Sequence, residues 1–209
     1  MALKQKTIVL SLIKCGETTW EVDGRLQGRS DLPLSPQGRS SVEQDVATLA
    51  GLRMGTIYHP ANEAASETAE LVARLVGAKT KPLAELAEAD LGLLDGLTEQ
   101  AFAERFPKRY KQWQEDPLSV SLPEGEVVGE ARARLFLALG RLLKRSRNNE
   151  VGVVLQSLGL GFLRCWLAAR PPTELWTLLK CRPRIERYLM AMETISQLAE
   201  AAKVQYSHS

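Results

Sequence analysis

Three short apolar runs, widely separated along the chain, restrict the folds that this sequence can adopt. They are "TIVLSLI" (7–13), "MGTIYH" (54–59) and "EVGVVLQ" (150–156). Such brief runs, in which β-branched residues are frequent, are typical of strands buried within a sheet. Segments of helical period separate them. This alternation predicts an α/β fold, a three-layer sandwich with helices on both faces of a mostly parallel sheet.

The predicted helix ends are marked by residues that suit helix termini. Ser35 followed by Pro36 predicts the start of one helix, which would end near Gly51. Asn62 predicts the cap of a second helix, which would end near Gly77. Further helices are predicted in two later segments, "VGEARARLFLALGRLLKRSR" (128–147) and "LGFLRCWLAAR" (160–170).

Three other segments are less regular. "KPLAEL" (81–86) is a third strand candidate, and "RIERYLMAME" (184–193) fits either a strand or a helix. The segment from 87 to 127 carries short helical signals without a sustained period. It is too patterned for a spacer, so we interpret it as an insertion near 87–127 that forms a lid over the strand ends.

Length and charge exclude several classes of function. The chain has 209 residues, enough for one sizeable core, and we expect a single domain over 1–209. A net charge of +2 gives no electrostatic argument for binding nucleic acid or a membrane surface. No apolar run is long enough to span a bilayer. The cationic stretches "KRYK" (108–111) and "KRSR" (144–147) are most simply solvated faces.

The cysteines and histidines are few. Cys15, Cys165 and Cys181 are widely spaced and odd in number, so they form no disulfide framework, and no CxxC pair suggests zinc. We therefore expect a reducing, cytoplasmic compartment, no metal and no cofactor. The two histidines are His59 and the penultimate His208.

A dense motif follows the first apolar run. The segment "LIKCGETTWEVDGRLQGRSDLPLSPQG" (12–38) resembles the opening motif of the histidine phosphatase superfamily, which has the phosphoglycerate mutase-like fold. Twelve positions match that family's pattern at the right spacing: Gly16, Glu17, Thr18, Trp20, Gly24, Arg25, Gln27, Gly28, Asp31, Pro33, Leu34 and Gly38. Later segments resemble the family's further motifs in the same order: "AASETAE" (64–70), "LAEADLGLLDGLT" (86–98), "PEGE" (123–126) and "VGVVLQSLG" (151–159).

The resemblance implies a set of catalytic positions that this chain fills with other residues. In the family, a histidine accepts a phosphoryl group, two arginines and a second histidine hold the phosphate, and a glutamate is the general acid. Here Cys15 stands at the nucleophile's position and Lys14 at the first arginine. Ala64 replaces the second arginine and Gln156 the second histidine. Glu88 alone is retained, so the site resembles a vestigial one.

These replacements predict weak attraction for phosphate. Glu21 replaces an asparagine and adds negative charge, while Lys14 and Arg25 are the cations that remain nearby. Removal of one electrostatic stabiliser typically costs about 10²–10³ in rate. We expect no catalytic residue and a weakly bound small phosphorylated or anionic ligand at most. The candidate ligand-binding residues are Lys14, Glu21, Arg25, His59 and Ala64.

Cys15 and His59 each have two interpretations. Cys15 is either a replacement nucleophile, activated by Lys14, or a small half-buried residue at a strand end. Cysteine phosphatases as a family place an arginine six residues after the cysteine, and Glu21 stands there. This favours the second interpretation. His59 either contacts a ligand at the sheet edge or is a surface or loop residue beside Pro60.

Three functions remain open from the sequence. The favoured one is a catalytically degenerate relative, a pseudoenzyme with a binding or regulatory role at the old phosphate pocket. The first rival is a weak or re-tooled phosphatase or mutase that uses Cys15 or His59 with Glu88. The second is a structural or assembly subunit, and Trp113, Trp166 and Trp176 suit a core or the contacts of a homo-oligomer.

Overall fold

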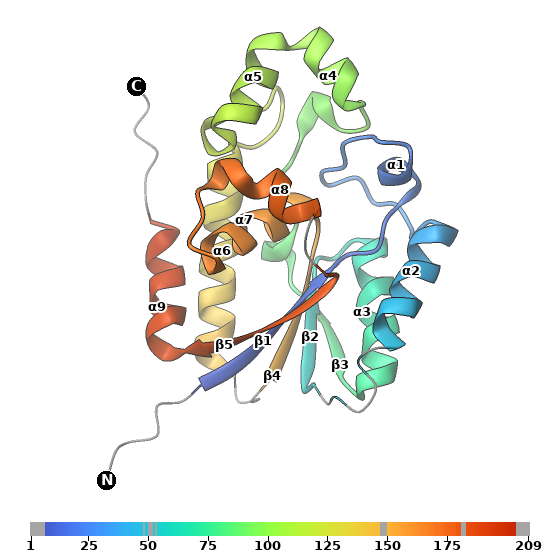
Figure 1. The fold of residues 1–209 in the computed structure, drawn as a ribbon, viewed down its shortest axis with the longest axis vertical. Coiled ribbons are helices and arrows are strands. Elements are labelled where there is room, and N and C mark those ends of the chain that lie inside the picture. The colour runs from blue at the N-terminus through green and yellow to red at the C-terminus, as the bar shows by residue number, and fades with distance from the viewer. Residues whose placement is uncertain are drawn as a thin grey trace.

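A five-stranded sheet of order β3-β2-β4-β1-β5 runs through the middle of the molecule (Figure 1). The computed structural model describes residues 7–47, 49, 52, 54–146, 150–180 and 183–203. Neighbouring strands are parallel except for the β1–β5 pair, which is antiparallel. The strands are β1 (Thr7–Lys14), β2 (Thr56–His59), β3 (Lys79–Pro82), β4 (Glu150–Leu155) and β5 (Ile185–Ala191).

The predicted α/β fold and its three buried strands are confirmed, and one weaker strand prediction is shifted. β3 ends at Pro82, whereas the sequence predicted a strand over 81–86; residues Ala84–Leu86 instead form the 3-10 helix η1. β3 is an edge strand whose four residues are all exposed, so no apolar pattern marks its position. The undecided segment 184–193 forms β5 and the start of helix α9 (Met192–Ala201).

Helices cover both faces of the sheet. Consecutive residues of a strand point to opposite faces, and consecutive residues of β1 belong to different parts of the core. Ile13 packs with helices α2 (Pro36–Ala47) and α3 (Glu63–Val76). Leu12 belongs to the larger cluster that contains residues of α6 (Val128–Arg145), α7 (Ser157–Leu167) and α9. This arrangement is the expected three-layer sandwich.

Local capping residues explain where α2 and α3 begin. Ser35 Oγ accepts a hydrogen bond from the backbone N–H of Gly38 (2.9 Å), and Asn62 Oδ1 accepts one from Ala65 N–H (3.0 Å). Gly77 ends α3 in the left-handed conformation, with φ 67°. α2 is described to Ala47, and its predicted end at Gly51 lies outside the described residues.

α7 begins and ends about three residues earlier than the predicted helix over 160–170. Its first backbone N–H groups are bound by Glu88, a residue far away in the sequence. The local sequence therefore could not mark this helix start.

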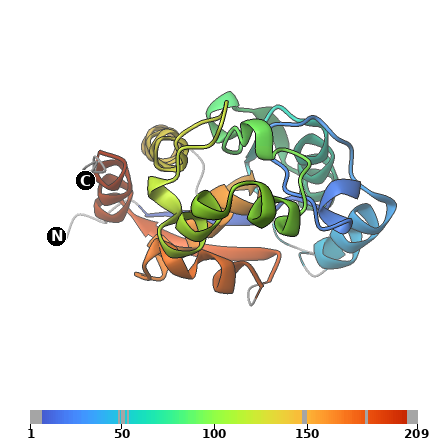
Figure 2. The same ribbon diagram turned by 90° about the horizontal axis from the view of Figure 1, so that it is seen from above.

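The segment from 87 to 127 forms a cap above the carboxyl ends of the strands (Figures 1 and 2). Aromatic contacts fix it: the ring centroids of Phe102 and Trp113 lie 5.8 Å apart, and those of Trp113 and Trp176 lie 5.3 Å apart. Trp176 belongs to helix α8 (Leu175–Lys180), so the cap is joined to the C-terminal part of the fold. The cap contains η2 (Gly92–Leu94), α4 (Glu99–Arg105), α5 (Pro107–Glu115) and η3 (Pro117–Ser119).

α6 is the longest helix that is described, with 18 residues. It buries one apolar side, including Phe136 and Leu139, and carries Lys144 and Arg145 in its last turn. Cations at this end favour the helix dipole. Within the described part of the chain, no helix combines the length and apolar character that crossing a membrane requires.

Candidate ligand-binding cleft

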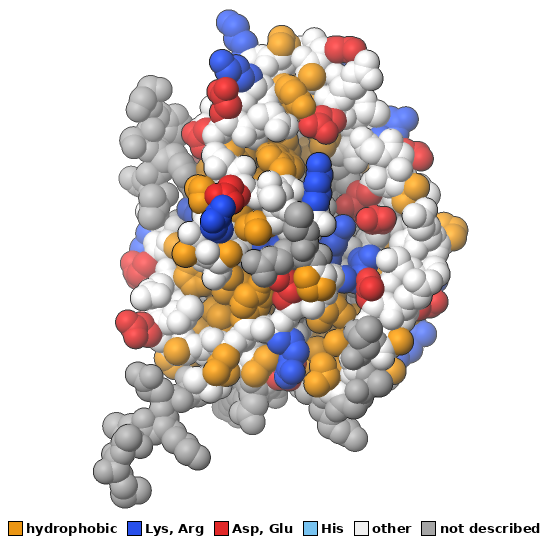
Figure 3. Space-filling model, in the orientation of Figure 1, with side chains coloured by type: hydrophobic (Ala, Val, Ile, Leu, Met, Phe, Trp, Pro, Cys, Tyr) orange, Lys and Arg blue, Asp and Glu red, His pale blue; other side chains and the backbone are white. Residues whose placement is uncertain are grey.

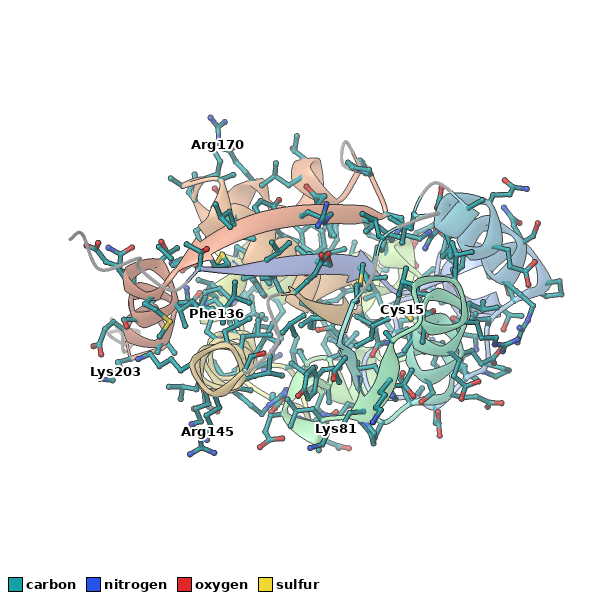
Figure 4. The ribbon with its side chains drawn as sticks, turned by 90° about the horizontal axis from the view of Figure 1, so that it is seen from below. Cys15, Lys81, Phe136, Arg145, Arg170 and Lys203 are labelled. Carbon is teal, nitrogen blue, oxygen red and sulfur yellow. The ribbon has the colours of Figure 1, made fainter. Side chains whose placement is uncertain are left out.

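Cys15 lies directly after β1, where its backbone N–H donates to the carbonyl oxygen of Leu155 on β4 (2.9 Å; Figure 4). Its side chain is 5% exposed, and Sγ lies 3.7 Å from Thr68 Oγ1. Burial, with a smaller contribution from the charge of Glu21, raises the pKa of the thiol to about 12. A thiol in this state is protonated near neutral pH and is a poor nucleophile.

The charged and polar side chains near Cys15 form ion pairs and hydrogen bonds with one another. Lys14 Nζ lies 3.5 Å from Glu17 Oε1. Glu21 and Thr18 form a capping box at the short helix α1 (Thr19–Val22). Ser157 Oγ donates to Glu21 Oε1 (3.3 Å), so the Glu21 carboxylate lies beside the start of α7. Burial raises the pKa of Glu21.

Ala64 lies in the first turn of α3 and is fully buried. Its carbonyl oxygen accepts a hydrogen bond from Thr68 Oγ1 (2.8 Å), which in turn accepts one from Gly16 N–H (3.0 Å). These two bonds hold the first turn of α3 against the segment that contains Cys15. The methyl group of Ala64 is part of this packed contact and offers no polar atom to a ligand.

Gln156 follows β4 directly, as Cys15 follows β1, so both lie at the carboxyl ends of neighbouring strands. The amide of Gln156 is already engaged, because Asn62 Nδ2 donates to its Oε1 over 2.7 Å. The sequence predicts only a capping role for Asn62. This residue performs that role with Oδ1 and binds Gln156 with Nδ2. No local signal predicts the second contact.

Glu88 occupies the N-terminus of α7. Its carboxylate accepts hydrogen bonds from Leu158 N–H (2.7 Å), Gly159 N–H (3.3 Å) and Ala89 N–H (2.9 Å). The start of a helix attracts anions because its N–H groups lack partners and its dipole is positive there. Here a carboxylate of the chain itself takes those donors. Burial raises the pKa of Glu88 to about 7 even though these bonds lower it.

A cavity of about 220 Å³, which we call the cleft, opens beside these residues. Its polar lining comprises Arg29, Asp31, Asn62, Glu88 and Gln156. Cys15 is not among the lining residues. Figure 3 shows acidic and basic side chains interspersed between α1 and α8, with no continuous positive surface in that view.

Arg29 was not among the predicted site residues, although it stands in the family motif between Gly28 and Asp31. Its guanidinium is neutralised within the structure. Nη2 lies 2.8 Å from Glu126 Oε1, and Nε donates to the backbone oxygen of Glu88 (3.3 Å). The cation that lines the cleft is therefore already paired.

None of the five predicted ligand-binding residues (Lys14, Glu21, Arg25, His59 and Ala64) is among the residues that line the cleft. Arg25 donates to the carbonyl oxygen of Gly96 (2.9 Å) in the cap region. His59 is 5% exposed, and its Nδ1 lies 2.7 Å from the carbonyl oxygen of Pro60. The interpretation of His59 as a surface or loop residue was wrong, because it is the last residue of β2 and its side chain is buried. Among the described residues, no cluster of histidine, cysteine, aspartate and glutamate is suited to hold a metal ion.

Comparison with known protein families matches most of this chain to one family model. The model of the histidine phosphatase superfamily (branch 1) matches residues 10–183. Among curated proteins, phosphoserine phosphatase 1 of Hydrogenobacter thermophilus is 24% identical over 170 residues, which cover 81% of each chain. A probable phosphoglycerate mutase, GpmB, of Citrobacter koseri is 27% identical over 152 residues, which cover 73% of this chain and 71% of its own.

Solved structures have the same architecture. YhfR of Bacillus stearothermophilus superposes with a TM-score of 0.74 at 26% identity, covering 81% of this chain and 84% of that one. A putative alpha-ribazole-5'-P phosphatase of Escherichia coli gives a TM-score of 0.70 at 24% identity, with coverage of 81% and 84%. At this lower identity, the likeness to the Escherichia coli protein concerns the fold alone.

Proposed function

This chain belongs to the histidine phosphatase superfamily, and we propose that it is a catalytically degenerate member whose cleft binds a small polar ligand without turning it over. The observation that carries the proposal is the state of Cys15 at the nucleophile's position. Its thiol is 5% exposed, lies outside the cleft lining and has a pKa raised to about 12. Phosphoryl transfer needs an accessible, activated nucleophile, and Cys15 is neither.

The other positions support the same proposal. Gln156 is bound by Asn62, and the donors at the start of α7 are bound by Glu88. Arg29 is paired with Glu126. A phosphate dianion would therefore find few free donors in the cleft and would face nearby carboxylates. A neutral ligand that carries hydroxyl or amide groups suits this lining better.

A phosphatase is the second candidate, and two observations favour it. Relatives such as phosphoserine phosphatase 1 are named as phosphatases. A pKa of about 7 also suits Glu88 as a general acid near neutral pH. His59 or Cys15 would then have to supply the nucleophile, and both side chains are buried.

Turnover measurements separate the two candidates. Purified protein is incubated with p-nitrophenyl phosphate, phosphoserine and 3-phosphoglycerate, and phosphate release is measured against a buffer blank. We expect no release that scales with protein concentration. Release that scales with protein and is lost in Cys15→Ser or His59→Ala would establish the phosphatase. The variant Arg170→Ala, on the exposed surface, is the matched control for mutation itself and should behave as the wild type. Activity from a contaminating enzyme would persist unchanged in Cys15→Ser and His59→Ala.

A further inference from the structure

A second cavity lies on the side of the sheet, between the edge strand β3 and helix α6, and we call it the lateral groove. Its volume is about 420 Å³, which falls within the range of small-molecule sites. The cleft and the lateral groove share the chain segment around η1: Leu83 and Glu85 line the groove, whereas Ala84 and Ala87 line the cleft. The groove has no part in the proposed function.

Three cations line the lateral groove from two facing elements. Lys81 comes from β3, and Arg141 and Arg145 come from the last two turns of α6. Figure 4 shows Lys81 and Arg145 on the same side of the sheet, with Arg170 on the opposite side. Glu85 is the carboxylate in the lining. The lining thus carries an excess of positive charge.

These cations are not neutralised within the described part of the chain. No ion pair joins Lys81, Arg141 or Arg145 to a described carboxylate, whereas most other arginines of the fold are paired. Arg141 and Arg145 stand four residues apart on one helix face, where like charges repel. The helix dipole accounts for cations on α6, but it does not account for Lys81 on the strand that faces them. A bound anion would relieve this repulsion.

Apart from Ser146, the rest of the lining is largely apolar. Tyr58 on β2 and Leu142 on α6 are half-buried, as is Leu83, which directly follows β3. A tyrosine ring offers a flat surface on which another ring can stack. The groove therefore combines an apolar wall with a cationic rim.

We propose that the lateral groove binds a small molecule that joins an anionic group to a flat apolar ring, at about the size of a mononucleotide. The anionic group, a phosphate or a carboxylate, contacts Lys81, Arg141 and Arg145. The ring packs on Tyr58 and Leu142. This site is separate from the cleft and requires none of the residues at the family's catalytic positions.

Isothermal titration calorimetry with defined probes tests this proposal. Adenosine monophosphate and 2-naphthoate each carry a ring and an anion, and they distinguish a phosphate ligand from a carboxylate ligand. Adenosine supplies the ring without the anion, and inorganic phosphate supplies the anion without the ring. We expect at least one of the first two to bind about tenfold more tightly than either partial probe, because a charge-assisted contact and ring packing both contribute. Raised sodium chloride should weaken the binding.

Matched variants locate the binding. Lys81→Ala and Arg145→Ala each remove one exposed cation of the groove and should weaken the probe by about fivefold or more. Arg170→Ala removes one cation on the opposite side of the molecule and should leave the affinity unchanged. Asn62→Ala alters the cleft and should also leave it unchanged.

Failure of both ring-bearing anions to bind would overturn the proposal, as would equal loss of affinity in Arg170→Ala. Loss of affinity in Asn62→Ala with none in Lys81→Ala would place the probe in the cleft and would equally refute the groove. Because the proposed function is tested by phosphate release, each proposal can fail without the other.

Discussion

Glu88 is a buried carboxyl group at the start of α7, and it should make stability depend on pH. Burial raises its pKa from the ordinary value of 4.5 to about 7. The folded protein therefore binds this proton more tightly than the unfolded chain does. The free energy of unfolding should fall as pH rises through this interval, by on the order of 3 kcal/mol. Urea unfolding at a series of pH values will measure the decline.

The substitution Glu88→Gln removes the titrating group and keeps an oxygen that can accept from α7. We expect its stability profile to be flatter than that of the wild type over this interval. The slope that remains comes in part from Glu21, whose pKa burial also raises. Glu85→Gln, at an exposed position three residues away, is the matched control and should retain the wild-type profile. A profile for Glu88→Gln as steep as that of the wild type would show that another group causes the decline.

Cys15 should resist alkylation in the native protein. Its thiol is buried and its pKa is raised to about 12, so the reactive thiolate is scarce and shielded. Iodoacetamide is added at neutral pH, and labelling of the peptide that contains Cys15 is followed by mass spectrometry. We expect labelling only as fast as the protein unfolds, and rapid labelling in urea. Native labelling at the rate of a free cysteine would contradict the burial and reopen a nucleophilic role.

At the scale of elements, a buried ion pair joins α7 to β5. Arg164 Nε lies 2.7 Å from Glu186 Oε2, and the two side chains are 1% and 8% exposed. Arg164 also donates to the carbonyl oxygens of Leu178 and Pro183. The variant Arg164→Met keeps the bulk but leaves a buried carboxylate and two carbonyl groups without these donors. We expect a loss of about 3–5 kcal/mol in the free energy of unfolding, measured with urea.

Arg170→Met is the matched control for this pair. Arg170 pairs with Glu174 on the surface, where its side chain is 56% exposed. An exposed pair contributes about 0–1 kcal/mol, so this variant should unfold close to the wild-type denaturant concentration. Equal losses in the two variants would mean that burial does not strengthen the Arg164–Glu186 pair.

The elements that could be predicted from the sequence are those whose signals are local. β1 and β4 are runs of apolar residues, and the starts of α2 and α3 carry their own capping residues. β3 and the start of α7 were misplaced, because an exposed edge strand has no apolar pattern and a carboxylate 70 residues away caps the helix.

In the candidate site, too, some features could be predicted from the sequence and others could not. The positions of Cys15 and Gln156 at neighbouring strand ends follow from strand order, because the carboxyl ends of parallel strands meet at one edge. The contacts that engage them do not follow. Asn62 binds Gln156 across 94 residues of sequence, and the covering of His59 depends on how segments pack. No short sequence pattern predicts the Asn62–Gln156 hydrogen bond or the burial of His59.

At the scale of the whole molecule, inorganic phosphate should not stabilise the fold. A ligand that binds only the native state, at free concentration L, raises the free energy of unfolding by RT ln(1 + L/Kd), and so raises the unfolding temperature. The cleft has few free donors for phosphate, since Arg29 and the start of α7 are bound internally. The lateral groove is proposed to bind tightly only when a ring accompanies the anion. We expect the same unfolding temperature in millimolar phosphate as in sodium chloride of equal ionic strength. A rise that continues with the logarithm of phosphate concentration would show a site for this anion, and its loss in Lys81→Ala would assign that site to the lateral groove.

Ala64 limits the evolutionary routes that are open to this chain. Its side chain is fully buried in a packed part of the core. A single mutation back to arginine would force a long charged side chain into that space, at a cost of about 1–3 kcal/mol for overpacking alone. Such a substitution would be tolerated only after other changes had made room around α3. If the proposed function is right, a return to phosphoryl transfer would therefore take more steps than its loss did.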